Sequence, residues 1–322
     1  MVPLSLEDKR GSGKLRNGSA IIRQVPEIVL LHYNYPAPPE LTGDGKVSVV
    51  WPHWTGFMKR FFRYTGWVLG GLLFLLSGPI LLATSGSLQG AESWQTATRE
   101  SAGIAPPPET AQEAIVQVYG ARAWSWRGYF AVHTWIATKE KGADHYQVHQ
   151  VIGWRNHVVN SGPGEPDRHW YGARPELYAD IRGAQAEKLI PRIYEAVDSY
   201  PFPTEYQAWP GPNSNTFVAW VIRQVPGLDV ALPNHAIGKD YLVDQIVAEV
   251  PGGAGYQVSF GGYFGLLAGV REGVELNVLG LSFGINPLAL GIKLPGIGEL
   301  ALRNTNPMPS DSDQTAGAGW EL

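Results

Sequence analysis

The feature that most constrains this chain is an uncharged apolar segment that follows a short basic cluster. The basic residues lie within 59–63, the apolar segment covers 66–84, and no charged residue occurs between Arg63 and Glu92. A helix of this length can cross a hydrocarbon layer of roughly 30 Å. Because basic residues favour the cytoplasmic side of a membrane, the sequence predicts a single span at 64–86 in the inner (cytoplasmic) membrane, with the C-terminal part exported.

The same segment also fits a secretory signal, so two interpretations of it stay open. Met58 begins the sequence MKRFFR, a basic stretch before an apolar one, which is how a signal peptide begins. We therefore expect Met58 to be the true start and residues 1–57 to be an upstream extension. The apolar part is long for a signal and its cleavage site is poorly defined, which favours an uncleaved anchor.

The composition excludes several classes of function. The chain has 322 residues, a net charge of −4 and no cysteine. The acidic balance argues against nucleic acid as a partner, and the lack of cysteine excludes disulfides, thiolate metal sites and a cysteine nucleophile. Residues 87–112 predict a linker because short runs of serine, glycine and proline occur there. We expect one exported domain at 113–302 and a disordered tail at 303–322.

Hydrophobic periodicity predicts an α+β domain built on an antiparallel sheet with a few helices. Strands are predicted at residues 114–119, 129–138, 146–154, 257–260, 263–270, 274–279 and 281–284. Residues 139–143 would make a hairpin of the second and third strands, and residues 160–167 are rich in turn formers. Residues 182–198 predict a helix that Pro191 kinks or divides in two. A second helix, 217–224, follows a run of capping residues.

Three motifs carry a resemblance to a known family. They are WPGPNSNTF at 209–217, AIGKDYL at 236–242 and EGVELNVLGLSFGINPLALGIKLPG at 272–296. Together they resemble an uncharacterised bacterial envelope family, domain of unknown function 3750, over about residues 114–302. The order of a strand histidine, a polar second strand and a capped helix also resembles the permuted papain-like (NlpC-type) hydrolases. That resemblance implies a permuted papain-like fold.

The papain-like resemblance implies catalytic roles for three residues. Where that family has its cysteine, this chain has Ser214, which could act as a nucleophile if a neighbouring base took its proton. The resemblance implies that His133 is this base and that His149 orients it. Each residue also has a structural interpretation. Ser214 fits a helix cap, and a strand histidine is often a partly buried ring bonded to a backbone carbonyl.

The resemblance also implies which residues would hold a ligand. Asn213, Asn215 or the helix N–H groups would stabilise an oxyanion. Apart from the resemblance, the aromatic residues at 169–172 and at Trp209 could form an apolar or sugar-stacking wall, or they could simply pack within their own loops. The leading hypothesis is an amide or ester hydrolase acting on a peptidoglycan peptide or a lipid. Because serine is a poorer nucleophile than a thiolate, a non-catalytic envelope binding module on the same fold is the alternative. A purely structural membrane-anchored protein is a third class.

A metal site is not expected, and no cofactor is implied. Asp144, His145, His149 and His157 are close in sequence and could supply nitrogen and oxygen ligands. Their order, however, matches no zinc-binding signature. We therefore expect these side chains to form a polar hairpin face in solvent.

Overall fold

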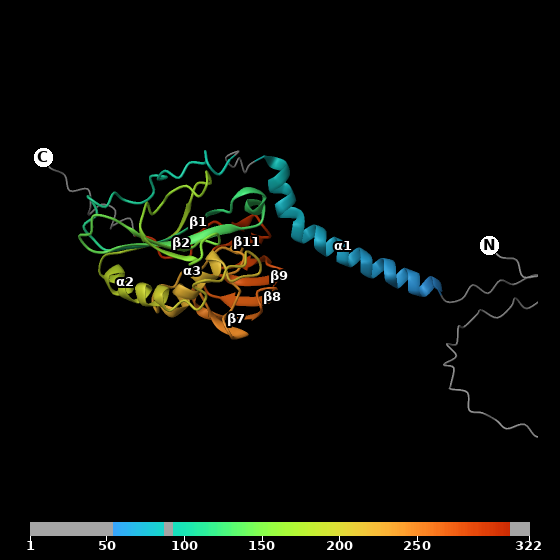
Figure 1. Cartoon of the computed structure of the whole chain (residues 1–322). Helices are drawn as coiled ribbons and strands as arrows, with labels where there is room; N and C mark the ends of the chain where they lie inside the picture. Colours follow the sequence, from blue (N-terminus) through green and yellow to red (C-terminus); the bar gives the residue numbers. More distant parts are fainter. Residues whose placement is uncertain (1–53, 87–92, 310–322) are drawn as a thin grey trace, which may run out of the picture. The chain divides into compact units, whose positions relative to one another are not determined.

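The structure is a computed structural model that describes residues 54–86 and 93–309 (Figure 1). Most of the expected extension at 1–57 therefore lies outside the described residues. The same is true of the last thirteen residues of the expected tail at 303–322 and of residues 87–92 in the expected linker.

The first helix, α1, is long and apolar enough to cross a membrane. It spans Trp54–Ser85, and the apolar part of it covers Gly56–Ser85. Within the described ranges it is the one helix with this property. The predicted helix is confirmed, although it begins before the expected residue 64. The chain divides into two units between Arg63 and Tyr64, inside α1, and both sheets belong to the second unit.

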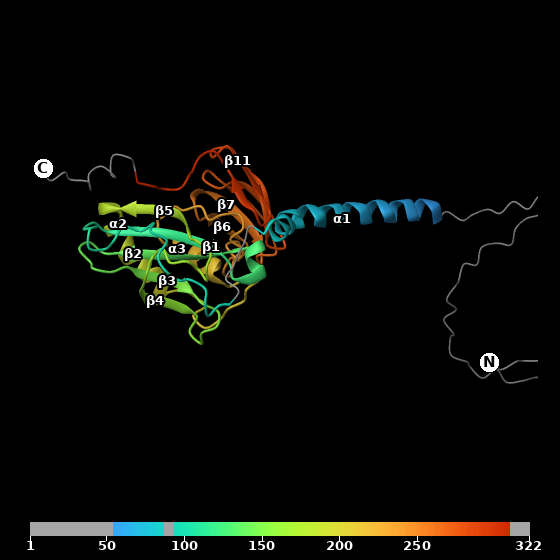
Figure 2. The same ribbon diagram turned by 90° about the horizontal axis from the view of Figure 1, so that it is seen from above.

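The first sheet of the described chain has five antiparallel strands in the order β4-β3-β2-β1-β5 (Figure 2). Their bounds are β1 Ile115–Arg122, β2 Val132–Lys139, β3 Gln147–Val151, β4 Val159–Pro163 and β5 Glu176–Arg182. A 3₁₀ turn, η1 (Ser125–Tyr129), links the first two. β2 and β3 form the predicted hairpin. β4 lies in sequence expected to be turns and β5 was not predicted. Both are edge strands, where glycine and proline are tolerated.

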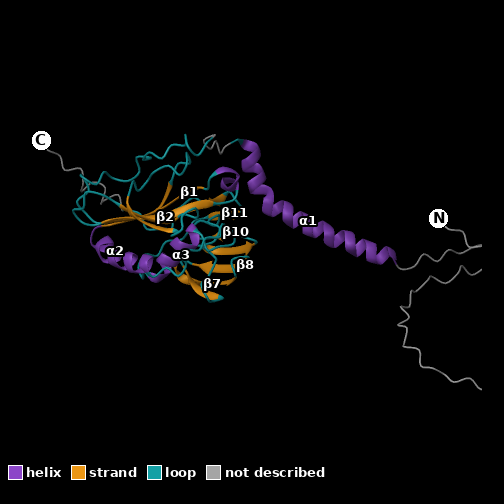
Figure 3. Ribbon diagram, in the orientation of Figure 1, coloured by secondary structure: helices purple, strands orange, loops and turns teal. Residues whose placement is uncertain are grey.

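Two helices lie on one side of this sheet (Figure 3). α2 spans Gly183–Asp198, and α3 spans Ser214–Gln224. Their apolar residues and one face of the sheet form the larger core, which includes Val116, Ile193 and Phe217. α2 continues through Pro191 as one helix, so the alternative of two short helices is wrong. The packing of the apolar face on the sheet outweighs the single backbone hydrogen bond that proline removes.

The opposite face of the first sheet is covered by loops and by the segment that follows α1. Ile104 and Ala111 from that segment pack against a second apolar cluster that contains Trp135. The Asp167 carboxylate fixes the segment in place, since it accepts a hydrogen bond from the backbone N–H of Ile104 (2.5 Å). Residues 93–112, expected as part of a linker, therefore lie against the domain.

The second sheet is an antiparallel meander whose seven strands follow chain order, from β6 at one edge to β12 at the other. Within 93–309 its bounds are β6 Val247–Val250, β7 Gly253–Phe260, β8 Phe264–Gly269, β9 Gly273–Val278, β10 Leu281–Asn286, β11 Gly291–Leu294 and β12 Gly298–Leu300. The four predicted strands correspond to β7–β10. The α+β class is thus confirmed, with two antiparallel sheets where one was expected. The permuted papain-like arrangement stays a prediction.

The second sheet turns a charged and polar face toward the interior of the domain. Glu275 of β9 accepts hydrogen bonds from Lys239 Nζ (2.7 Å) and Lys293 Nζ (2.6 Å). All three side chains are at most 2% exposed. Burial alone would raise the pKa of Glu275, but the two lysines outweigh burial and lower it. Because a buried charge is costly unless it is paired, this triad holds β9, β11 and the loop after α3 together.

Candidate functional site

Asn213, which sequence reasoning assigned to an oxyanion site, is the N-cap of α3. Its Oδ1 accepts hydrogen bonds from the backbone N–H groups of Asn215 (2.9 Å) and Thr216 (3.2 Å). The Thr216 hydroxyl accepts the backbone N–H of Asn213 in return (3.1 Å), which completes a capping box. The Asn213 Nδ2 donates to the carbonyls of Ala208 and Ile237. The whole amide is therefore used to start the helix.

Asn215 joins α3 to the first sheet. Its Nδ2 donates to the carbonyls of Val132 (3.0 Å) and Ile237 (2.7 Å). Its Oδ1 accepts from the Thr134 hydroxyl (2.9 Å). Since the amide donors are engaged in these bonds, the Asn215 side chain has no free N–H for an oxyanion. Ser214, the first helical residue, is only 4% exposed.

His133 lies on the face of β2 that points away from α3. Consecutive strand residues point to opposite faces, and Thr134 is the one that contacts the helix. The His133 ring stacks on Trp170, with 3.6 Å between ring centroids, and its Nε2 lies 3.1 Å from Gln150 Oε1. Burial lowers the pKa of His133 to about 3, so the ring is neutral near pH 7. His133 thus faces Trp170 and Gln150, whereas Thr134 faces Asn215 of α3.

His149 faces the helices but lies further along the sheet. Its Nε2 is 3.0 Å from Thr138 Oγ1, and its Nδ1 is 2.6 Å from the Ser161 hydroxyl. Thr138 is four residues beyond Thr134, or roughly 13 Å along the strand at about 3.3 Å per residue. The catalytic roles of Ser214, His133 and His149 stay a prediction.

Trp209 lies beside the second sheet. Its indole N–H donates to the carbonyl of Leu279 (2.9 Å), in the turn between β9 and β10. Its ring packs edge-to-face on Tyr263, with centroids 4.9 Å apart. Trp209 is 45% exposed and does not line the two cavities of the first sheet.

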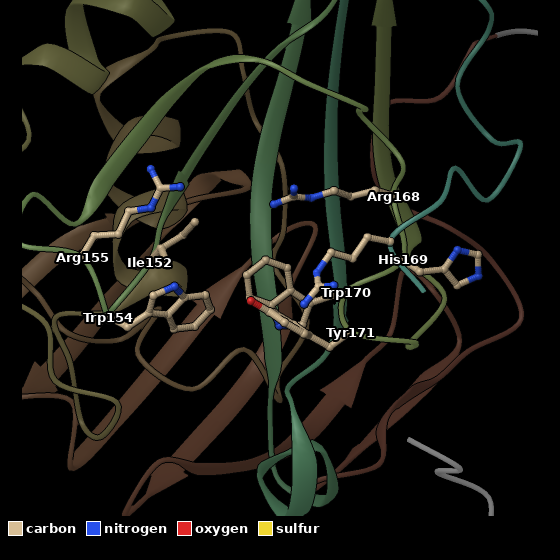
Figure 4. A pocket seen from close by; sticks show the side chains of 8 residues that line it. Ile152, Trp154, Arg155, Arg168, His169, Trp170 and Tyr171 are labelled. Carbon is tan, nitrogen blue, oxygen red and sulfur yellow. The ribbon is translucent and has the colours of Figure 1, made fainter. Parts of the chain in front are cut away.

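A pocket of about 130 Å³ lies on the loop-covered side of the first sheet (Figure 4). It is lined by Arg99, Ile152, Trp154, Arg155, Arg168, His169, Trp170 and Tyr171. Figure 4 shows residues 152–155 opposite residues 168–171, with the Arg168 side chain extending toward the first group. The Trp154 ring lies 6.2 Å from that of Trp170 and 5.9 Å from that of Tyr171. The expected wall at 169–172 therefore lines a pocket, with Trp154 as its aromatic partner.

Three arginines surround this pocket without an acidic partner. Arg99 lies over the Tyr171 ring (4.5 Å) and Arg155 donates to Asn160 Oδ1 (2.5 Å). The Arg168 guanidinium lies 5.8 Å from the Trp170 ring centroid and makes no hydrogen bond or ion pair within the described ranges. No described carboxylate lies within 4 Å of any of these three guanidinium groups.

The positive charge of the pocket is unbalanced. Burial is the largest effect on Arg168 and lowers its pKa. Tyr171 opposes this effect, while the charges of Arg99 and Arg155 add to it. A guanidinium group binds carboxylate or phosphate with two parallel hydrogen bonds, and tryptophan rings bind apolar or sugar faces. The pocket is therefore suited to an anion that also has a flat, weakly polar surface.

Sequence reasoning did not find these arginines because they come from segments far apart in the chain. An isolated β-bridge between Ser101 and Arg168 brings the segment after α1 to the loop after β4. The one local signal was the aromatic sequence at 169–172, which directly follows Arg168. His133 belongs to this site as a support, because its ring stacks on the buried side of Trp170.

A second cavity of about 400 Å³ lies on the helix-covered side, between β3, β4 and α2. It is lined by Glu140, Ala143, His145, Gln147, His149, Ser161, Tyr194, Val197 and Asp198. Thr138 Oγ1 lies 3.0 Å from His149 Nε2 and 3.4 Å from the Tyr194 hydroxyl, and Ser161 Oγ lies 2.6 Å from His149 Nδ1. Burial lowers the pKa of His149 to about 4, which keeps the ring neutral. Ser161 was not singled out from the sequence.

The polar residues considered as metal ligands are engaged elsewhere. His145 Nδ1 lies 2.6 Å from Asp144 Oδ1, and His157 Nδ1 lies 3.0 Å from the carbonyl of Val159. The part of the chain that the structure describes contains no group of three or more histidine and acidic side chains placed to hold a metal ion.

Comparison with known proteins finds one family to which part of the chain is similar. No curated protein and no solved structure matches the chain. A family model does match, over β1–β5, α2 and α3, and it ends before β6. The resemblance noted from the motifs is therefore confirmed for the first sheet and its helices. Residues 113–241 match the model of the family described as "Protein of unknown function (DUF3750)".

Proposed function

We propose that this protein is a membrane-anchored, non-catalytic binding protein of the cell envelope that holds an anionic ligand in the Arg168 pocket. The observation that carries the proposal is the half-buried Arg168 guanidinium, which has no partner among the described residues and lies beside Trp170. Leaving such a charge unpaired away from water is costly. A bound carboxylate or phosphate would remove this cost.

The ligand class follows from the chemistry of the pocket walls. Arg99 and Arg168 favour an acidic group, and Trp154 favours a sugar ring or a flat apolar group. Peptidoglycan fragments combine both features, and anionic lipid head groups supply the acidic one. The basic cluster at 59–63, near the start of α1, favours export of the residues that follow the helix, which would place the pocket in the compartment where both are found.

Replacing Arg168 with glutamine should weaken ligand binding by about tenfold or more, because it removes a charge-assisted pair of hydrogen bonds. The measurement is a titration of the full chain in detergent micelles, followed by tryptophan fluorescence. Muramyl dipeptide, which carries a sugar ring and a carboxylate, is one probe, and glycerol 1-phosphate, a lipid head group, is the other. The parent protein should bind at least one probe more weakly as salt is added.

Arg192→Gln on the exposed surface of α2 is the matched control, since it removes the same charge at a site far from the pocket. It should leave binding unchanged. Equal binding by the parent protein and Arg168→Gln would contradict the proposal, as would binding that does not respond to salt.

A second candidate function is hydrolysis at Ser161. The observation that favours it is the 2.6 Å separation between the Ser161 hydroxyl and His149 Nδ1 at the edge of an open cavity. A neutral histidine could take the serine proton as the oxygen attacks an ester or amide carbonyl. Thr138 Oγ1, 3.0 Å from His149 Nε2, would help to orient the ring. The low pKa of His149 makes it a weak base, so this function ranks second.

Labelling with a fluorophosphonate distinguishes the serine candidates. If Ser161 is a nucleophile, Ser161→Ala should abolish labelling and Ser214→Ala should retain it. The reverse result would instead favour the role that the papain-like resemblance implies for Ser214. Absence of labelling in the parent protein would remove the hydrolase function at both serines and leave the binding proposal untouched.

A further inference from the structure

The outer face of the second sheet is apolar from one edge to the other. In β7–β10, alternate residues pointing away from the domain are valine, leucine, isoleucine, phenylalanine, tyrosine or alanine, and most are exposed. Strand register aligns them into three rows across the sheet. The rows are Phe260–Phe264–Val278–Leu281, then Val247–Val258–Leu266–Leu276–Phe283, then Tyr256–Ala268–Val274–Ile285–Ile292–Leu300. We call these residues the apolar face.

This polarity is the reverse of that in an antiparallel sheet with one face in water, where polar residues point outward and apolar residues inward. Here the inward residues include Glu275, Asn277 and Lys293, all buried. The outward residues include Leu266 and Ile285, which are 52% and 55% exposed. An exposed apolar area across several strands is larger than soluble monomers usually tolerate. Something other than water is therefore expected to cover the apolar face.

The membrane-spanning candidate α1 touches this same face. The Phe74 ring packs edge-to-face on Phe283, which belongs to the middle row, with centroids 5.2 Å apart. Close by, Gly78 is buried, and a Cβ at this position would collide with the carbonyl of Pro295 after β11. Glycine thus permits close contact between the helix and the second sheet. A lipid layer around this part of α1 would also meet the apolar face.

The edge of the apolar face has the residues expected at a lipid–water boundary. Tyr263 and Trp209 lie together at the turns beside the first row, and tyrosine and tryptophan favour the head-group region of a bilayer. A charged residue on this side, Glu249, is on the edge strand β6, opposite Tyr256. Strands β7–β11 pair on both sides, so their backbone groups are already satisfied, as a lipid environment requires.

We propose that the apolar face lies in the outer part of the bilayer that α1 crosses, with the sheet parallel to the membrane surface. The domain would then be held by a spanning helix and by a sheet whose side chains enter the lipid. This inference rests on the membrane anchoring in the proposed function, and it is independent of ligand binding at Arg168. The contact with α1 favours lipid over a second copy of the chain as the occupant, because the helix already requires lipid beside this face.

The lack of cysteine in the chain makes a direct test simple. Single variants Leu266→Cys and Leu276→Cys report on the apolar face, Leu73→Cys reports on α1, and Lys188→Cys on α2 is the water-exposed control. Each full-length protein is labelled with the fluorophore NBD and placed in vesicles of phosphatidylcholine and phosphatidylglycerol. Doxyl-labelled lipids then quench probes in lipid, and dithionite bleaches probes in water.

We expect the probes on Leu266→Cys, Leu276→Cys and Leu73→Cys to be quenched by doxyl lipid. We also expect dithionite to bleach them about tenfold more slowly than the control, because an interfacial apolar face lies roughly 5–10 Å below the lipid surface. Lipid contact at Leu73→Cys with rapid bleaching at both sheet positions would overturn the proposal and leave the anchor intact. Rapid bleaching at all three would show that the anchor itself fails. Slow bleaching without doxyl quenching, together with disulfide formation between two Leu266→Cys copies, would replace lipid by a second copy of the chain.

Discussion

Replacing Glu275 with glutamine is expected to lower the free energy of unfolding by about 3–5 kcal/mol, because it leaves two buried lysines without their shared counter-charge. Lys239 and Lys293 both depend on this carboxylate, and both are at most 2% exposed. The Asp240 carboxylate, 3.5 Å from Lys239, can compensate only in part. The measurement is denaturant unfolding of the full chain in detergent micelles at pH 7, followed by circular dichroism.

A control variant and the pH dependence of unfolding test the same role of the Glu275 carboxylate. Glu249→Gln on the exposed surface of β6 is the matched control and should change stability by less than about 0.5 kcal/mol. The folded state lowers the pKa of Glu275 below its ordinary value of 4.5, so its contribution is complete above pH 4.5 and is lost as the pH falls through the folded pKa. Unfolding curves of Glu275→Gln that match the parent at pH 7 would rule out the triad as a stabilising element.

Replacing Asn215 with alanine should cost about 2–4 kcal/mol, because buried groups then lose their hydrogen-bond partner. The Thr134 hydroxyl and the Val132 carbonyl would both be affected. Loss of these bonds would also loosen the attachment of α3 to β2. Thermal unfolding of the full chain in micelles measures the change.

Ser214→Ala separates this structural role from a catalytic one. Ser214 follows the N-cap residue and is not expected to make side-chain hydrogen bonds like those of Asn215. Ser214→Ala should therefore lower the free energy of unfolding by less than about 1 kcal/mol. A larger loss of stability for Ser214→Ala than for Asn215→Ala would contradict our inference that Asn215 attaches α3 to β2.

The sequence contained enough to predict the elements with strong periodicity. α1 follows from hydropathy alone, β3 follows from alternation, and β1, β2 and β7–β10 follow from short apolar and β-branched runs between turn residues. The strands that escaped prediction, such as β4 and β12, are short and contain glycine, proline or charged residues. Pairing with a neighbouring strand makes them strands, and a single sequence does not contain that information.

The two faces of β2 show what alternation in a sequence leaves open. Alternation implies that His133 and Thr134 point to opposite faces, but it does not say which face α3 covers. In the structure, α3 lies on the Thr134 face of β2, and the His133 ring on the other face stacks on Trp170. The binding pocket could not be predicted either, because Arg99 and Arg168 meet through a bridge between two loops.

The direction of the apolar face could not be predicted from the sequence. Short apolar and β-branched runs in β7–β10 correctly predicted strands, but the usual expectation is that their apolar side chains point inward. The buried partners of Glu275 are outside these strands or far along the chain, so nothing local marks the polar side as the interior.

The chain-order meander of the second sheet has a consequence for biosynthesis. Because each strand from β7 to β12 pairs with the strand made just before it, every new strand finds its partner as soon as it leaves the ribosome or translocation channel. Such local pairing is fast compared with pairing between distant segments. Lys239 and Asp240, which satisfy the charged side of the sheet, are also synthesised before it. The second sheet would therefore form against residues that have already been synthesised. This limits the time during which its apolar strands are unpaired and prone to aggregate.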